Sequence, residues 1–188
     1  MPTTTAKAIQ TTIIGSRVCL RPLARSDATA MIRLTNQSAR RFPGLVRRIK
    51  GRAQFEEFWK RFDGDTAFSF VICRKEDGAA VGSISLFQII RRSRQNGVVG
   101  YLIGARFLRQ GYATEALQLV LRFAFRHLKL HRIEADVQSH NVPSIALVKR
   151  AGFKYEGSLR GFLKIAGQWR DHQRWAILAE DWRGHRRK

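Results

Sequence analysis

Acidic residues are scarce in this sequence of 188 residues, which has 14 Asp and Glu against 35 Lys and Arg. The formal net charge is +21 at pH 7. A chain this basic attracts anions such as RNA, an acidic membrane surface or a polyphosphate group, and it repels polycations such as polyamines. The charge leaves open which anion is bound.

Cysteine is rare as well, with only Cys19 and Cys73, each inside an apolar run. This placement predicts two buried, reduced thiols. Neither has a Cys or His nearby at ligand spacing, so no metal site is expected. The histidines form no close pair either, and we interpret all of them as structural or surface residues: His127, His131, His140, His172 and His185.

Long apolar runs are missing, since none approaches the ~20 residues of a membrane span. Residues 1–7 (MPTTTAK) lack the apolar core of a signal peptide. We therefore expect a cytoplasmic protein without membrane contact. The hydrophobic content of 44% supports one core. We predict a flexible lead-in at residues 1–15, one domain at 16–182 and a basic tail at 183–188.

Hydrophobic periodicity predicts an alternation of strands and helices along the chain. Strands are expected at residues 17–23, 67–74, 80–90, 98–104, 132–138, 153–165 (with a break) and 170–179. Helices are expected from residue 28, around 55–62, from about 111 to 128, and at 143–151. This order favours an α/β fold with one mixed sheet flanked by helices.

The start of the longest predicted helix has the features of an anion site. The first N–H groups of a helix have no internal partner, and the helix dipole places partial positive charge there. Gly111 and the small Ala113 would let a diphosphate approach the backbone, with Arg109 as a cation and Thr114 as a hydroxyl. The alternative is an ordinary helix start with Gly111 in a tight turn. The P-loop and dinucleotide patterns are both absent.

A second segment, residues 140–153 (HNVPSIALVKRAGF), follows the next predicted strand. Together with residues 109–116 (RQGYATEA) it resembles the two cofactor-binding segments of the GNAT superfamily. Residues 131–133, 155–157, 167–172 and 181–182 extend the resemblance to the ribosomal-protein-alanine N-acetyltransferases, the RimJ branch. The resemblance covers about residues 17–182 and is strongest from Tyr101 onward. It implies the GNAT fold, with a mixed, mostly antiparallel sheet of about seven strands.

The resemblance also implies an acetyl-CoA-dependent N-acetyltransferase and a set of contacts for its co-substrate. In this fold two neighbouring strands separate, and the pantetheine arm lies along the exposed edge of one of them. Backbone groups of Leu102 and Ile103 would lie beside the arm, and a peptide N–H there can polarise the thioester carbonyl. Asn141 would bind the arm, or cap the short helix, or do both. The expected cofactor-binding residues are Leu102, Ile103, Arg109, Gln110, Gly111, Tyr112, Ala113, Thr114, Asn141 and Ser144.

The implied reaction is direct attack of a neutral amine on the thioester. Many relatives place a Tyr seven residues after the Asn as general acid, but that position is Val148 here. Ser144 is the nearest substitute, and its alternative role is to cap the helix. No carboxylate stands out as a base, and water can take the proton; Glu134, Glu156 and Asp171 are interpreted as structural. Leu108 replaces a usual Gln or Arg of the phosphate loop, which predicts weaker cofactor binding.

The acceptor suggested by the resemblance is the N-terminal α-amine of a protein, in particular a ribosomal one. A small-molecule amine is the enzymatic alternative. A non-catalytic RNA- or ribosome-binding module on a GNAT fold is the alternative of another class. The basic stretch at residues 40–52, with Arg91, Arg92 and Arg94, would favour substrates on RNA or with acidic surfaces. The alternative interpretation of this basic stretch is a solvated surface without a binding role.

Overall fold

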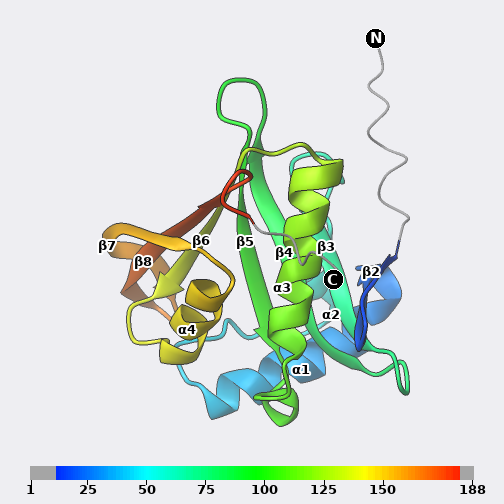
Figure 1. Cartoon of the computed structure of the whole chain (residues 1–188). Helices are drawn as coiled ribbons and strands as arrows, with labels where there is room; N and C mark the ends of the chain where they lie inside the picture. Colours follow the sequence, from blue (N-terminus) through cyan, green and yellow to red (C-terminus); the bar gives the residue numbers. More distant parts are fainter. Residues whose placement is uncertain (1–11, 183–188) are drawn as a thin grey trace.

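The computed structural model describes residues 12–182, which form eight strands and four α-helices (Figure 1). The helices are α1 (Ala28–Arg41), α2 (Arg52–Trp59), α3 (Tyr112–Arg122) and α4 (Val142–Arg150). The strands are β1 (Ile13–Ile14), β2 (Val18–Pro22), β3 (Phe68–Arg74), β4 (Ala80–Ile90), β5 (Asn96–Ile103), β6 (Arg132–Gln138), β7 (Lys154–Ile165) and β8 (Gln168–Leu178).

The strands form one sheet in the order β1-β2-β3-β4-β5-β6-β8-β7. All neighbours are antiparallel except β5 and β6, which are parallel. The sheet has eight strands rather than about seven, because β1 pairs with β2. This two-residue strand lies within the stretch expected to be a lead-in, and it is too short for a periodicity to reveal. Residues 1–11 and the tail at 183–188 lie outside the described residues.

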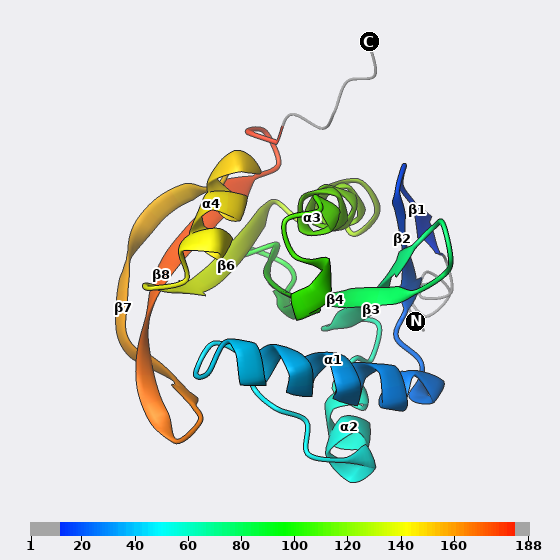
Figure 2. The ribbon, with the colours of Figure 1, turned by 90° about the horizontal axis from the view of Figure 1, so that it is seen from below.

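The helices cover both faces of the sheet (Figure 2). Helices α1 and α2 lie on one face, and α3 and α4 lie on the other. The apolar stripe predicted for the longest helix faces the sheet, since Ala116, Leu117, Val120 and Leu121 are fully buried. The helix continues beyond α3 as a π-helical turn, Phe123–His127, so it ends where the periodicity predicted.

Both cysteines are free thiols, as predicted, although Cys19 is only half-buried while Cys73 is buried. Among residues 12–182, no three His, Cys, Asp or Glu side chains gather in a way that could hold a metal ion. Over the same residues, no helix has the length and apolarity needed to cross a membrane.

The sheet has a gap between β5 and β6. Their pairing covers only residues 96–98 of β5 and ends at Val98 opposite Glu134, while β5 continues along β4 and β6 along β8. The Gly104 N–H donates to the Val81 carbonyl of β4 at 2.8 Å. In an antiparallel pair every second residue directs its N–H and C=O groups toward the partner strand, so Gly104, Leu102 and Gly100 face β4. Backbone groups of Val99, Tyr101 and Ile103 therefore point away from β4, toward the gap.

A buried ion cluster holds β5 and β6 together where the gap begins. The Glu134 side chain is buried, and its carboxylate accepts from Arg132 Nε at 2.8 Å and from Asn96 Nδ2 at 3.4 Å. Arg174 Nη1 lies 3.6 Å from the same carboxylate. This cluster fixes the point at which the two strands separate.

We expect Glu134→Ala to lower the free energy of unfolding by about 2 kcal/mol, the scale for losing hydrogen bonds to a buried charge. Glu180→Ala is the matched control, because Glu180 pairs with His131 at 3.3 Å but its side chain is 61% exposed. Its expected cost is below about 0.5 kcal/mol. Urea unfolding measures both values. Equal midpoints for the two variants would show that the cluster does not stabilise this junction.

Candidate functional site

The start of α3 presents backbone N–H groups that no side chain of residues 12–182 caps. Gly111 is the N-cap residue, with φ +83, and within the described residues no side chain caps this helix. The acidic residue of the first turn, Glu115, is engaged elsewhere, since its carboxylate accepts from the Arg17 backbone N–H at 2.9 Å. The first N–H groups, those of Tyr112, Ala113 and Thr114, are thus available to an anion.

Cationic side chains surround this helix start. Arg109 is exposed and has φ +62, and Arg17 Nη1 donates to the Gln110 carbonyl at 2.8 Å. The Arg17 guanidinium also lies 5.0 Å above the centre of the Tyr112 ring. A Cβ added to Gly111 would meet only Arg17 Nη1, at 3.4 Å, so the space over this backbone is open. Leu108 is half-buried against the core and adds no polar group.

The gap between β5 and β6 contains a cavity of about 210 Å³. Its wall includes strand residues 99–101 and 135–138 together with the start of α4 and the β7–β8 hairpin. Of the ten cofactor-binding residues expected from sequence, Asn141 and Ser144 line it. Asn141 is the N-cap of α4, and its Oδ1 accepts from the Ser144 backbone N–H at 3.3 Å. The interpretation of Ser144 as the helix cap is therefore wrong.

Three further polar residues line this cavity, of which Tyr101 and Gln138 were not expected as site residues from the sequence and His172 was interpreted as a structural or surface residue. The Tyr101 hydroxyl donates to the Ser144 carbonyl at 3.4 Å, and burial raises the pKa of this hydroxyl. Gln138 Nε2 donates to the Leu45 carbonyl at 3.4 Å, while its Oε1 is buried without a partner in the described part of the chain. His172 is 2% exposed, and its Nδ1 donates to the Arg170 carbonyl at 2.9 Å. Their only sequence signal is a polar group within a strand.

The position that relatives fill with Tyr is fully buried here as Val148, so it supplies no hydroxyl. The carboxylates considered from sequence are engaged in structural contacts. Glu134 and Glu156 both pair with Arg132. Asp171 Oδ1 accepts from the Gly161 N–H at 2.7 Å, across the β7–β8 hairpin. These contacts match the structural roles expected for all three acids.

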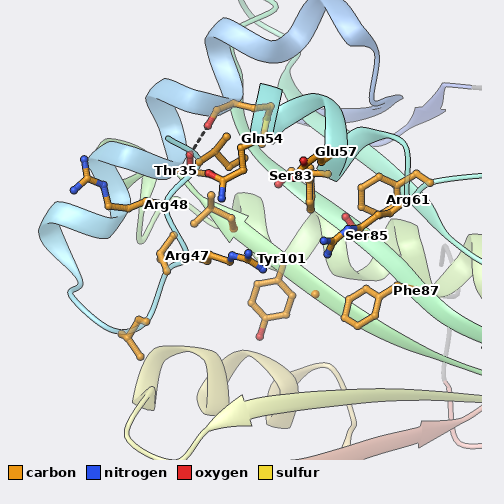
Figure 3. A pocket seen from close by; sticks show the side chains of 18 residues that line it. Thr35, Arg47, Arg48, Gln54, Glu57, Arg61, Ser83, Ser85, Phe87 and Tyr101 are labelled. Carbon is orange, nitrogen blue, oxygen red and sulfur yellow. Dashed lines mark hydrogen bonds between the residues drawn. The ribbon is translucent and has the colours of Figure 1, made fainter. Parts of the chain in front are cut away.

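A larger cavity, of about 320 Å³, lies beside the gap on the face covered by α1 and α2 (Figure 3). Its floor is β4 and β5, with Ser83, Ser85 and Phe87 on the β4 side. Its walls come from α1, from α2 and from the segment between them. The two cavities share Leu45, Gly100 and Tyr101, so they adjoin along β5.

The basic stretch at residues 40–52 does not form one uniform surface. All four of its arginines outside α2 are exposed: Arg40 and Arg41 lie at the end of α1, and Arg47 and Arg48 lie at the rim of the larger cavity and line it. Glu57 and Arg61 of the α2 region line it as well. Sequence reasoning missed this cavity because its residues come from four separated segments without a common motif.

The chain is similar to known proteins in sequence and in fold. Residues 17–154 match the family model described as "Acetyltransferase (GNAT) domain". The chain is 37% identical over 175 residues to the "Probable N-acetyltransferase YjcK" of Bacillus subtilis, covering 89% of this chain and 97% of that protein. It is 34% identical over 117 residues to the "[Ribosomal protein uS5]-alanine N-acetyltransferase" of Escherichia coli, covering 62% and 60% of the two chains.

Among solved structures, Mycobacterium smegmatis RimJ in complex with CoA-disulfide is similar, with a TM-score of 0.77 and 28% identity. The match covers 87% of this chain and 82% of that one. The splayed strands, the uncapped helix start and these matches together show that the chain belongs to the GNAT family and is an N-acetyltransferase.

Proposed function

We propose that this enzyme transfers the acetyl group of acetyl-CoA to the N-terminal α-amine of a protein, in particular a ribosomal protein. The observation that carries the proposal is that the cavity in the β5–β6 gap adjoins the larger cavity along β5, the strand that leads into the uncapped start of α3. The similarity to a uS5-alanine N-acetyltransferase supports a protein N-terminus as acceptor. A small-molecule amine remains the alternative acceptor.

The residues at the α3 start fit a diphosphate group. In the proposal, the N–H groups of residues 111–114 bind its oxygens, and Arg109 neutralises part of its charge. Gly111 is required because its φ of +83 and its open side leave the backbone accessible. Leu108 contributes no hydrogen bond, so backbone groups do most of the binding. The bound acetyl-CoA supplies the activated acetyl thioester.

The edge of β5 fits the pantetheine arm. Ile103 directs its backbone groups toward the gap, whereas the same alternation directs those of Leu102 toward β4. We therefore assign the main-chain contact to Ile103 and side-chain contact to Leu102, which lines the larger cavity. Asn141 borders the arm from α4 while it caps that helix.

Ser144 is the group we propose as general acid. It lines the gap at the start of α4, and its side chain has no capping role. The amine first loses one proton to solvent and attacks the thioester carbon to form the N–C bond. The nitrogen then releases its second proton to water, the C–S bond breaks, and the departing thiolate takes up a proton. The Ser144 hydroxyl would donate that proton and recover it from water. A backbone N–H of β5 would polarise the thioester carbonyl.

Mass spectrometry of peptides incubated with the enzyme and acetyl-CoA tests this function. Peptides that begin with Ala, Ser or Met should gain one acetyl group on the α-amine, with one free CoA thiol released per transfer. The same peptides with a blocked α-amine should stay unmodified. Acetylation of small amines only would support the alternative acceptor. Stabilisation by CoA without any transfer would favour the non-catalytic, ribosome-binding alternative.

The exposed arginines at the end of α1 provide a separate test of recruitment by RNA. We propose that Arg40 and Arg41 contact RNA when the acceptor is on a ribosomal particle. Neutralising both with Gln should then raise KM for such particles several-fold at low salt with little change in kcat, as expected for lost uniform binding. Activity on a short peptide should not change. Equal KM values on particles would contradict recruitment.

A further inference from the structure

The larger cavity has an unusual balance of charge. Four charged residues line it, three of them cationic: Arg47, Arg48, Arg61 and Glu57. Arg48 is turned outward, since its Nε lies 3.5 Å from Asn36 Oδ1 on α1. Arg47 and Arg61 reach toward the cavity from two sides in Figure 3. An acceptor bound there therefore meets two guanidinium groups and one carboxylate.

Within the described residues, Arg47, Glu57 and Arg61 form no ion pair. By contrast, the neighbouring Glu56 of α2 pairs with Arg25 at 3.0 Å and with Arg52 at 3.5 Å. The guanidinium groups at the cavity are thus free to bind carboxylates of a ligand.

The remaining wall is uncharged: Phe58 and Phe62, packed edge to face at 4.9 Å between ring centres, and other apolar side chains line it together with Thr35, Gln54, Ser83 and Ser85. Phe87 of β4 contributes a further ring. Such a wall suits the backbone and apolar parts of a peptide, so charge is the feature that distinguishes one acceptor from another. Because two guanidinium groups outnumber the single carboxylate, the net positive charge of the cavity disfavours binding of polycationic acceptors.

We propose that the acceptor is a protein N-terminus with acidic side chains within its first few residues. Arg47 and Arg61 bind these acids, and Glu57 attracts the α-ammonium group before it loses its proton. This inference rests on the proposed function, because it specifies which protein N-termini the same site accepts. It assigns specificity to residues of the larger cavity, separate from the co-substrate contacts in the gap.

Two peptides of equal length test the proposal, one beginning Ala-Glu-Asp and the other Ala-Gln-Asn, with identical residues after the third. The wild type should show a kcat/KM about 10-fold higher for the acidic peptide at low salt, the scale of two partly exposed ion pairs. Salt should reduce this ratio, since the Debye length falls to about 10 Å at 0.1 M. Because both peptides are measured with the same enzyme preparation, the ratio of their kcat/KM values does not depend on the fraction of enzyme that is active.

Matched variants assign the preference to particular residues. Arg47→Gln with Arg61→Gln should bring the kcat/KM ratio of the two peptides close to one. Arg92→Gln with Arg94→Gln is the control, because these exposed arginines lie in the β4–β5 turn and do not line the cavity. The control should keep the wild-type ratio.

The outcomes separate this inference from the proposed function. Equal kcat/KM for both peptides in the wild type would overturn the acidic specificity and leave the proposed function standing. Equal kcat/KM values together with inhibition of peptide acetylation by an RNA oligomer would assign Arg47 and Arg61 to RNA binding. This result would also overturn the acidic specificity. A lost preference in the control variant would show a general effect of net charge. Acetylation of neither peptide would overturn both proposals.

Discussion

A Gly111→Val variant is expected to fold and to lose its binding of CoA. The φ of +83 at this position suits glycine, and a β-branched residue there costs about 1–2 kcal/mol. The valine methyl groups would occupy the open space beside the N–H groups at the start of α3. A ligand at 100 times its Kd stabilises a protein by about 2.7 kcal/mol, which raises Tm by about 5–10 °C at this size. The variant should lose this whole shift.

Gly78→Val is the matched control for backbone strain. Gly78 has φ +70 in the β3–β4 turn, and nothing lies within 4 Å of an added Cβ. Both variants should therefore lose a similar amount of stability without ligand, but Gly78→Val should keep the full shift in Tm with CoA. A full shift in Gly111→Val would show that the diphosphate does not bind at this helix start.

Ser144→Ala is expected to lower kcat by about 100-fold or more, the scale for loss of a general acid. Its stability should stay within about 0.5 kcal/mol of the wild type, since the capping group is Asn141. Steady-state kinetics and urea unfolding on the same preparation measure both quantities. Rate and stability thus respond separately to this substitution.

Two further variants complete this test. Asn141→Ala should cost about 1 kcal/mol of stability, because it removes the cap from α4. Tyr101→Phe removes the hydroxyl that bonds to the Ser144 carbonyl, and kcat should fall only a few-fold. A 100-fold loss in Tyr101→Phe with normal turnover in Ser144→Ala would transfer the role of acid to Tyr101.

Much of the fold could be predicted because its elements have strong periodicity. The apolar positions of α3 repeat at helical spacing, and Gly111 marks the helix start, so both were placed correctly from sequence. The strands β3 to β6 are apolar runs between turn residues and were also found. The short strand β1 was missed because two residues carry no pattern.

The larger cavity could not be predicted, because packing between distant segments creates it. Arg47 and Arg61 occur in basic or amphipathic stretches whose sequence is typical of an exposed surface. Only the position of α1 and α2 on the β4–β5 floor brings them to one site. Tyr101 likewise gains its contact with Ser144 through the separation of β5 from β6.

Hydrogen–deuterium exchange with and without saturating CoA tests the proposed co-substrate site, because it reports where CoA binds. We expect slower amide exchange in three segments: residues 99–103 of β5, residues 111–114 at the start of α3 and residues 141–144 at the start of α4. Protection confined to the basic stretch at residues 40–52, with no change in these three segments, would show that CoA does not bind along β5.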